Sequence, residues 1–409
     1  MNLPFFIARH LALHQHKTFS RFIVRLAIVA VSLSVAVMII GSAITRGYQK
    51  TIREKFFACW GQIQIIPYTE NPSNLMQAET FGYEANLHQR IQTEVNSQAV
   101  YPFLIQSGII KQADGLDGIL LKGYDSILPK GLYTAGLNAN IQNLNSVGDS
   151  NFILLSEQRA AELNVKAGDK LTLLFVNPNQ STPKARRVFI KALYHTGLEE
   201  FDRLFAITSN QFLRQVNDLD SNAIQGYEVY LNENESLPIQ THLNDNIMDA
   251  PLRAYTLEER FDAVFSWLEL MQTNEQIIWI IMLLIAVVNM ATALLILMFE
   301  RTRMIGLLKA LGMTNASLSK LFLYTGAYIC SVGLFIGNAI GLGVCLWQQY
   351  TGAIQLDEKV YYIREVPIHL QGSILLFING LSLLLCVGLM LIPVRMLRTV
   401  SPVKALQFS

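Results

Sequence analysis

The chain has 409 residues, of which 51% are hydrophobic and only 15% are charged, and its mean hydropathy is +0.31. Soluble domains carry about 25% charged residues, so this composition excludes an ordinary soluble domain and indicates a membrane protein. With a formal net charge of +1, we expect no nucleic-acid partner.

Four long runs contain no Asp, Glu, Lys or Arg, and they lie at 26–44, 277–299, 321–347 and 374–394. Each reaches the roughly 20 residues that a helix needs to cross a bilayer. We therefore predict four transmembrane helices. The first run has 19 residues, longer than the apolar core of a signal peptide, and no small-x-small cleavage site follows it, so we expect an uncleaved anchor.

The basic residues set the orientation of these helices. The segments 1–25, 300–320 and 393–409 together carry eleven Lys and Arg residues and one acidic residue, whereas the rest of the chain carries 21 basic and 30 acidic residues. Cytoplasmic loops are enriched in Lys and Arg. Both termini and the 300–320 segment are therefore predicted to be cytoplasmic.

The N-terminal 25 residues mix apolar side chains with basic ones, which predicts a helix lying at the membrane interface. His10, His14 and His16 raise the alternative of a metal site, but no carboxylate or cysteine accompanies them, and we expect no metal. Three of the four cysteines, Cys330, Cys345 and Cys386, fall in apolar runs, so no disulfide framework is predicted.

About 230 residues separate the first two apolar runs, enough for one large domain or two smaller ones. The ends of this region, 48–60 and 257–271, have helical apolar spacing and predict a paired stalk that extends the membrane helices. Its centre predicts an α+β domain. Strand-like patterns occupy 62–67, 169–176 and 187–193, a helical pattern occupies 156–163, and 177–183 is rich in turn residues.

The segment that follows the second apolar run, ERTRMIGLLKALG at 300–312, is amphipathic. Met304, Ile305, Leu307, Leu308 and Leu311 can embed at the membrane interface while Arg301, Arg303 and Lys309 stay in water. On composition alone, this is either a basic anchor that ends a membrane helix or a short helix that meets a cytoplasmic partner.

The third apolar run carries Gly333, Gly337 and Gly341, a spacing that lets another helix approach closely. Packing within the chain and packing against another subunit are both open. Asn289, Asn338 and Asn379 are the most polar side chains of the apolar runs, and interhelical hydrogen bonding is their simplest role. None of these runs holds an ionisable relay, which favours ATP-powered work over ion-driven transport.

Several stretches together resemble a known family. They are ERTRMIGLLKALGMT after the second apolar run, ARHLALHQHKTFSRFI near the N-terminus, LLSEQRAAELNVKAGDKLTL, VYYIREVPI between the last two runs, and SPVKALQ at the C-terminus. The chain resembles the MacB-type, FtsX-like permeases of ABC transporters, and within them the lipoprotein-releasing, LolC/LolE-type permeases. The resemblance implies an α-helical membrane protein with four transmembrane helices and a large α+β periplasmic domain on a helical stalk, the type VII ABC permease fold.

The resemblance implies a multi-pass protein of the bacterial inner membrane. From the patterns and the resemblance we predict an elbow helix at 1–25, membrane helices at 26–44, 277–299, 321–347 and 374–394, a periplasmic domain with its stalk at 45–275, a cytoplasmic coupling segment at 300–320, a periplasmic loop at 348–373 and a cytoplasmic tail at 395–409.

The resemblance also implies the working parts and partners of the chain. A coupling helix would dock on a separate ABC ATP-binding subunit, which would hold ATP and Mg, because this chain has no G-x-x-x-x-G-K-[ST] loop and no cofactor of its own is expected. The residues of that helix are Glu300, Arg301, Arg303, Ile305, Gly306, Lys309 and Gly312. Other expected partners are a second permease subunit, either a copy or a paralogue, acylated lipoproteins drawn from the outer leaflet, and membrane lipids.

A periplasmic lipoprotein chaperone would contact a protruding hairpin, and an ordinary surface loop is the alternative. The candidate hairpin residues are Val176, Asn177, Pro178, Pro183, Arg186 and Arg187.

Three other functions are alternatives to lipoprotein release. A MacB-like efflux or export permease would share the helices but usually carries its own N-terminal ATPase. An FtsX-like regulator would pass the work of ATP hydrolysis to a periplasmic hydrolase without moving lipid. A periplasmic enzyme could use Glu199, Glu200 and Asp202 beside His195, although a solvated loop explains these residues equally well. We expect a transporter permease and no enzyme.

Overall fold

The computed structural model describes residues 18–74, 79–95, 97–111, 115–125, 127–134, 151–176, 183–232 and 236–391. The chain divides into two compact units. A helical unit takes in 1–49, 268–355 and 365–409, and a sheet unit takes in 50–267 and 356–364. The sheet unit therefore includes part of the connection between the third and fourth apolar runs.

The helical unit contains the predicted apolar runs. Its helices are α2 (Thr18–Trp60), α10 (Asp262–Glu300), α11 (Thr302–Ala310), α12 (Asn315–Thr351) and α14 (Gly372–Leu389), with α2 and α10 extending into the sheet unit. Within the described residues, α2, α10 and α12 are long and apolar enough to cross a membrane, and α14 is a shorter apolar helix. The fourth span therefore stays a prediction. The elbow helix falls largely, and the C-terminal tail entirely, outside the described residues.

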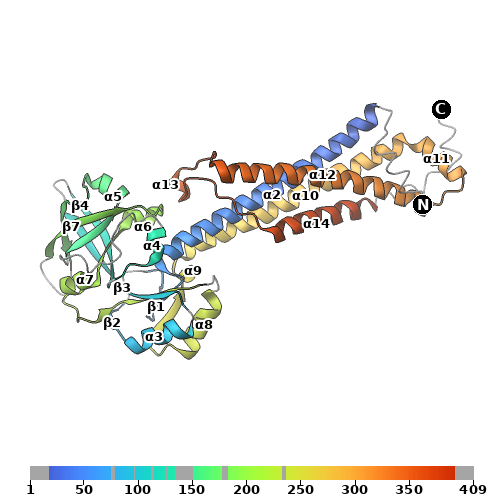
Figure 1. Cartoon of the computed structure of the whole chain (residues 1–409). Coiled ribbons are helices and arrows are strands. Elements are labelled where there is room, and N and C mark those ends of the chain that lie inside the picture. The colour runs from blue at the N-terminus through green and yellow to red at the C-terminus, as the bar shows by residue number, and fades with distance from the viewer. Residues whose placement is uncertain are drawn as a thin grey trace. The chain divides into compact units, whose positions relative to one another are not determined.

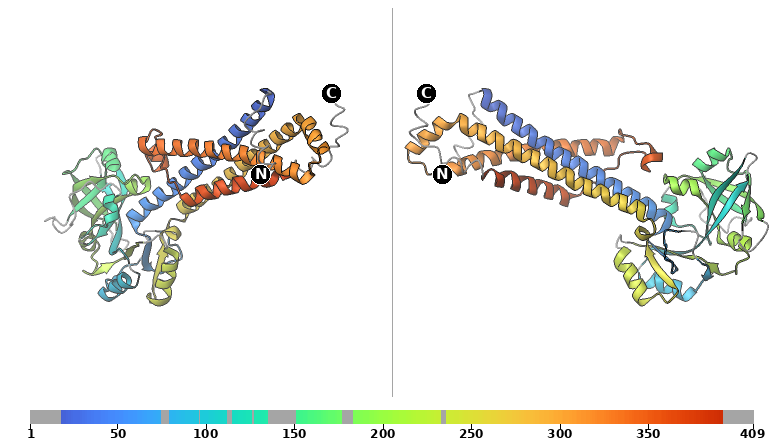
Figure 2. Two further views of the ribbon diagram at one scale, coloured as in Figure 1. Left: turned by 45° about the vertical axis from the view of Figure 1, so that its right-hand side comes forward. Right: turned by 180° about the vertical axis from the view of Figure 1, so that it is seen from behind.

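Helices α2 and α10 lie side by side in all three views of Figures 1 and 2. Val31 and Val35 of α2 are fully buried in a cluster that also holds Met290 of α10. Two polar contacts join the outer ends of the apolar runs. Gln49 Nε2 donates to the Leu268 carbonyl at 2.6 Å, and Arg46 Nε lies 3.5 Å from a carboxylate oxygen of the buried Glu275.

The three glycines of α12 face α2. A Cβ added to Gly337 would lie 2.7 Å from the Ser32 carbonyl oxygen, and one added to Gly333 would lie 2.8 Å from Val31 Cγ1. At Gly341 the nearest atom, Ile39 Cβ, would be 3.1 Å away. The backbones of α2 and α12 come this close because glycine has no side chain. In this structure the stripe packs within the chain.

Replacing Gly337 with Leu is expected to destabilise the helical unit by about 1–3 kcal/mol, because the new side chain must displace α2 from α12. Thermal unfolding of the full chain in lipid nanodiscs measures the effect. Gly343→Leu on the same helix is the matched control, since a Cβ at Gly343 meets nothing within 4 Å. Equal losses from both variants would contradict the close α2–α12 packing.

Asn338 of α12 and Asn379 of α14 form a reciprocal amide pair, with Nδ2 to Oδ1 distances of 2.6 and 3.0 Å. Such a pair joins two apolar helices without leaving a polar group unsatisfied. The third residue of this group, Asn289, forms no such pair within the described part of the chain. Its side chain lies on an exposed face of α10 and has no hydrogen bond to another side chain or carbonyl within the described part of the chain.

The sheet unit is built on one nine-stranded sheet in the order β11-β1-β10-β3-β4-β8-β5-β7-β6, with β6 also pairing with β3 (Figure 1). Its strands are β1 (Ile63–Pro67), β3 (Ala99–Lys111), β4 (Leu116–Tyr124), β5 (Phe152–Ser156), β6 (Lys170–Phe175), β7 (Lys184–Tyr194), β8 (Phe205–Ser209), β10 (Gly226–Tyr230) and β11 (Leu252–Thr256), and a separate pair is formed by β2 (Phe81–Gly82) and β9 (Ala223–Ile224). The second pairing of β3 closes six of these strands into a barrel.

Short helices complete the sheet unit. They are α3 (Ala85–Glu94), α4 (Lys130–Thr134), α5 (Glu157–Leu163), α6 (Glu199–Leu204), α7 (Asn210–Asn217), α8 (Ser236–Asn246), α9 (Leu257–Arg260) and α13 (Glu358–Tyr361). One apolar core fills the barrel and takes side chains from α5 and α7. A second core lies between β1, β10 and β11 and helices α3 and α8. The α+β expectation thus matches a sheet unit with two cores.

Aromatic contacts join the two stalk segments inside the sheet unit, as the helical spacing at 48–60 and 257–271 predicts. Phe56 of α2 lies with its ring centroid 5.4 Å from Phe261 and 5.8 Å from Phe265. Trp60, the last residue of α2, is buried against Phe205, with 4.9 Å between centroids. Aromatic edge-to-face pairs of this kind add to the free energy of burial.

A fully buried ion pair lies beside Trp60 at the end of α2. Lys122 of β4 places Nζ 2.7 Å from Glu228 Oε1 of β10, donates to the Cys59 carbonyl at 2.7 Å, and lies 3.8 Å from the centroid of the Trp60 ring. Glu228 also accepts hydrogen bonds from Tyr124 and Gln64, at 2.9 and 3.0 Å. The network joins the end of α2 to three strands of the sheet.

Candidate functional site

The predicted coupling helix, at 300–312, contains helix α11, which follows a break at the end of α10. Helix α10 ends at Glu300, Arg301 leaves helical geometry with φ −101° and ψ 13°, and α11 begins at Thr302. The break lets the short helix take its own direction after the apolar run (Figure 1).

Gly312 ends α11 with φ +89°, a left-handed conformation that glycine adopts without steric cost. Its N–H bonds to the Lys309 carbonyl and that of Met313 to the Leu308 carbonyl, each at 3.0 Å. Thr314 then caps α12 by accepting from the Ser317 N–H at 3.3 Å. The turn between α11 and α12 is therefore set by local backbone chemistry.

The apolar residues of α11 divide between two sides of the helix. Ile305 is buried and Leu308 packs partly against the core of the helical unit, whereas Leu307 is 54% and Leu311 76% exposed. Arg303 and Leu307 lie on one face of α11, and Leu311, the C-cap residue that follows Ala310, continues their four-residue spacing. We call this stripe the exposed face of α11. Ile305 and Gly306 are buried.

A hollow of about 360 Å³ lies beside the start of α11. Glu300, Arg301, Arg303, Met304 and Leu307 line it. Among the described residues, buried Glu300 Oε2 and Arg301 Nε have no hydrogen-bond partner. Buried polar atoms are normally paired, so these two atoms are exceptions within the described residues.

The candidate chaperone hairpin is described only in part. Val176 follows β6 and is 55% exposed, and Pro183 is exposed just before β7, while Asn177 and Pro178 lie outside the described residues. Arg186 and Arg187 are exposed on β7, opposite Leu173 and Thr172 of β6. The described residues at the base of the predicted hairpin therefore present two exposed cations.

Of the acidic residues beside His195, Asp202 belongs to a cluster of hydrogen-bonded and charged side chains. Asp202 is 2% exposed, and its carboxylate accepts the N–H groups of Thr196 and Gly197 and the Thr196 hydroxyl at 2.8 to 3.1 Å. Burial raises the pKa of Asp202, although these hydrogen bonds oppose the shift. His195 Nδ1 lies 3.6 Å from Asp202 Oδ2. A carboxylate with its acceptor sites filled in this way is poorly placed to act as a general base.

Sequence reasoning missed two further members of this cluster. Glu358 and Arg364 come from the connection between α12 and α14, and Glu358 Oε1 lies 2.9 Å from His195 Nε2. Burial raises the pKa of Glu358, but hydrogen bonds from Arg364 and His195 outweigh it, and the net pKa is lowered. VYYIREVPI carries part of the family resemblance, but no local pattern in the sequence links it to His195.

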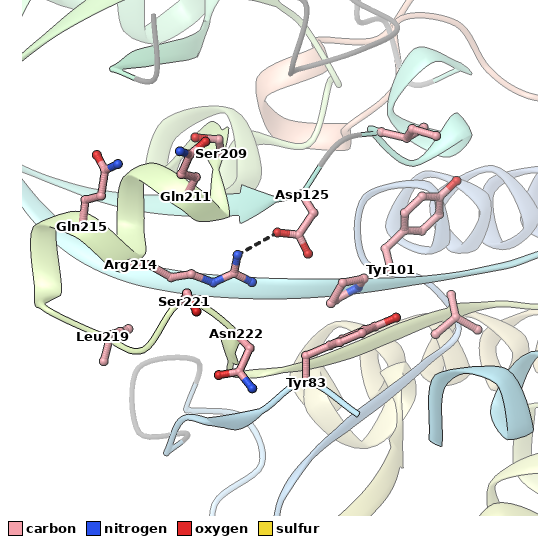
Figure 3. Close-up of a pocket in the computed structure, with 13 residues that line it drawn as sticks. Tyr83, Tyr101, Asp125, Ser209, Gln211, Arg214, Gln215, Leu219, Ser221 and Asn222 are labelled. Atoms are coloured by element: carbon pink, nitrogen blue, oxygen red, sulfur yellow. Dashed lines mark hydrogen bonds and ion pairs between the residues drawn. The ribbon is translucent and has the colours of Figure 1, made fainter. Parts of the chain in front are cut away.

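The sheet unit also has a groove of about 920 Å³ between β3, α7 and the residues before β9. Figure 3 shows Arg214 of α7 pointing at Asp125, with 3.1 Å between Arg214 Nη1 and Asp125 Oδ1, and Tyr83 and Tyr101 along the same groove. Arg214 Nε also donates to the Ala223 carbonyl at 2.8 Å. These contacts occupy the charged groups of the groove. The part of the chain that the structure describes holds no cluster of three or more His, Cys, Asp or Glu suited to a metal.

Comparisons with known proteins agree with this architecture. Residues 277–402 match the FtsX-like permease C-terminal family. The chain is 22% identical to the lipoprotein-releasing system transmembrane protein LolE of Haemophilus influenzae, over 95% of this chain and 96% of that protein. It is 23% identical to the lipoprotein-releasing system transmembrane protein LolC of Neisseria meningitidis, over 98% of this chain and 97% of that protein.

Among solved structures, the extracellular domain of the noncanonical ABC-type transporter YknZ from Gram-positive bacteria matches with a TM-score of 0.30 and 13% identity, over 48% of this chain and 98% of that one. The sequence matches extend over nearly the whole chain and thus include both units. The chain is thus similar over nearly its whole length to the LolC and LolE permeases, and its C-terminal part matches an FtsX-like permease domain, which together support an ABC permease of the LolC/LolE type.

Proposed function

We propose that this chain is a permease subunit of an ATP-driven transporter that extracts lipoproteins from the outer leaflet of the bacterial inner membrane and passes them to a periplasmic acceptor. The similarity to LolE and LolC over nearly the full length of all three chains carries this proposal. In this arrangement both termini and α11 are cytoplasmic and the sheet unit is periplasmic, in keeping with the distribution of basic residues.

The proposed transporter needs two further kinds of subunit. ATP and Mg would be bound by a separate ABC ATP-binding subunit, which docks on the exposed face of α11. Leu307 and Leu311 would fill an apolar groove of the ATPase while Arg303 meets an acidic rim. A second permease subunit, a copy or a paralogue, would complete the transporter.

The lipid anchor of the cargo sets the energetic problem. Each acyl CH₂ group leaving the bilayer costs about 0.8 kcal/mol, so extraction needs an apolar surface that replaces the lipid. Exposed apolar residues of α2 and α10 are candidates for that surface, for example Leu26 and Leu33 on α2 and Ile280 and Leu284 on α10. The cargo would then reach a chaperone at the base of the β6–β7 hairpin, where Arg186 and Arg187 suit an acidic partner.

Release of an acylated lipoprotein to a soluble acceptor tests the proposal. The chain is co-purified with its ATPase and second permease in nanodiscs loaded with a fluorescent triacylated lipoprotein. Release that requires ATP hydrolysis and the acyl chains is the expected result. A non-acylated version of the same cargo is the control, and no ATP-dependent release of it is expected.

Two other results would contradict lipoprotein release. ATP-dependent movement of a small amphiphile but not of lipoprotein would indicate an efflux permease of the MacB type. ATP hydrolysis that activates a periplasmic hydrolase, with lipoprotein left in the membrane, would indicate an FtsX-like regulator.

A further inference from the structure

We propose that residues Leu356–Arg364, here called the strap, form a latch between the α12–α14 connection and the sheet unit, and that lipoprotein release requires this latch. The proposal rests on the proposed function for its second half only. The strap belongs to the sheet unit, although Gln355 before it and Glu365 after it belong to the helical unit. The chain thus enters the sheet unit through the strap as well as through α2 and α10.

The strap is a closed loop with its own internal structure. Its base is pinched where the Leu356 N–H donates to the Arg364 carbonyl at 2.8 Å. The short helix α13 follows, and the Tyr362 N–H donates to the Glu358 carbonyl at 2.8 Å. A loop with joined ends moves as a body, so a pull on α12 or α14 is passed to the side chains that the strap carries.

Glu358 is the centre of the contact between the strap and the barrel side of the sheet unit. One carboxylate oxygen meets His195 Nε2 at 2.9 Å, and the other accepts from Arg364 Nε. Arg364 Nη2 also lies 3.0 Å from His195 Nε2. His195 can therefore donate to Glu358 or, in the other tautomer, accept from Arg364, so either neutral form of the ring is tied to the strap.

A second set of contacts secures the other end of the strap. Lys55 Nζ, from the stalk part of α2, donates to the Tyr362 carbonyl at 2.7 Å, and the Tyr362 hydroxyl bonds to Glu200 of α6. Burial lowers the pKa of Lys55, while Glu358 and Asp202 oppose the shift. Tyr362 has φ +60°, which non-glycine residues seldom adopt without tertiary contacts to hold them. The strap thus bonds to α2 as well as to the barrel side.

Gly197 leaves the room that this contact needs. Its φ is +71°, and a Cβ there would collide with Lys55 Nζ and lie 2.5 Å from Glu358 Oε1. The turn before α6 is therefore shaped to admit the Glu358 carboxylate and the Lys55 ammonium together.

The contacts between the strap and the rest of the sheet unit are mainly polar, and contacts of this kind can form and break. Ile363 is a buried apolar side chain of the strap, but Val360 and Tyr361 are exposed, and the contacts described above are polar. Partly exposed ion pairs add little stability each, and segments held by few apolar contacts open more readily than a packed core. Such a contact can hold in one state of a transport cycle and release in another.

Charge reversal at Glu358 tests the latch in the full complex. Glu358→Lys places a cation beside His195, Arg364 and Lys55, and hydrogen–deuterium exchange of the 356–364 amides is expected to rise at least tenfold. ATP-dependent lipoprotein release is expected to fall at least tenfold, while ATP hydrolysis stays within twofold. Glu358→Gln, which keeps an acceptor for His195, is expected to produce a smaller change in both.

Two further variants make the result specific. Glu199→Lys reverses a nearby charge for which no hydrogen bond or ion pair is found in the described residues, and it is expected to leave strap exchange unchanged. Adding His195→Glu to Glu358→Lys restores opposite charges across the contact and is expected to recover most of the exchange protection and of the release.

Different results would contradict the latch and the proposed function. Unchanged strap exchange in Glu358→Lys overturns the latch, and faster exchange with undiminished release overturns its role in transport. If the unmodified complex releases no lipoprotein, the proposed function fails, and the exchange data alone decide whether the strap is latched through Glu358.

Discussion

Replacing Lys122 with Met is expected to lower the free energy of unfolding of the sheet unit by about 3–5 kcal/mol, because it leaves the Glu228 carboxylate buried without its cation. Both side chains are fully buried. Burial lowers the pKa of Lys122 and raises that of Glu228, and the ion pair between them opposes both shifts. Removing one partner therefore lowers the free energy of unfolding by far more than the intact pair contributes to it, because the remaining charge stays buried without a counter-ion.

The expected loss is measurable as a fall in melting temperature of the full chain in nanodiscs. For a domain of this size, 1 kcal/mol corresponds to about 2–4 °C, so a fall of about 10 °C is expected. Trp60 reports directly on the site, since Lys122 Nζ lies 3.8 Å from its ring centroid. Its fluorescence is expected to change in the folded state of Lys122→Met.

Two comparisons isolate the ion pair. Lys191→Met removes an exposed lysine from β7 and is expected to shift the melting temperature by little. Adding Glu228→Gln to Lys122→Met removes the unpaired charge but keeps an acceptor for Tyr124, and part of the lost stability is expected to return. A Lys122→Met protein as stable as the unmodified chain would show that Glu228 accepts a proton at no cost.

The features that the sequence predicts best depend on neighbours in the chain. The apolar runs correspond to α2, α10, α12 and α14, and the stalk follows from aromatic residues spaced at three to five positions, such as Phe56 and Trp60, which meet Phe261 and Phe265 across the two helices. The strand predictions at 169–176 and 187–193 match β6 and β7 closely. The pattern at 62–67 correctly predicts a strand, but every residue of β1 is buried because β10 and β11 flank it and Gln64 bonds to Glu228.

Features that join distant parts of the chain were not predictable in this way. The pairing of β6 with β3 closes the barrel, and no local periodicity marks it. Lys122 and Glu228 each interrupt an apolar strand, which was a signal of a buried charge, but their pairing requires the sheet order. Glu358 lies 163 residues from His195, so the strap contact appears only in three dimensions.

The amphipathic pattern of 300–312 illustrates a partial success. Helical spacing groups the apolar residues, but it does not say which of them touch their own chain. The structure assigns Ile305 to the core of the helical unit and leaves Leu307 and Leu311 exposed. Exposed leucines on a short helix with a basic residue in line suit the docking role proposed for α11, since the centre of a protein interface is apolar and its rim is polar.

Replacing Leu307 and Leu311 together with Glu is therefore expected to weaken ATPase binding at least 100-fold. Two apolar contacts worth about 1.4 kcal/mol each account for a factor of 100, and the new carboxylates add the cost of burying charge. Binding of the purified ATPase to the permease in nanodiscs, followed by its change in ATP hydrolysis, measures the effect. Arg303→Glu and Lys309→Glu together are expected to weaken binding less, because rim charges mainly affect the association rate.

The matched control replaces two equally exposed leucines of the sheet unit, Leu116 and Leu237, with Glu. That variant is expected to bind the ATPase normally, because the proposed docking surface lies on α11. If the Leu307 and Leu311 variant binds as the control does, α11 does not dock through this face. If binding is retained while lipoprotein release is lost, the face transmits force without contributing affinity. The described geometry favours loss of binding, because two large apolar side chains on one helix face remain uncovered while Ile305, on the opposite face, is already buried in its own chain.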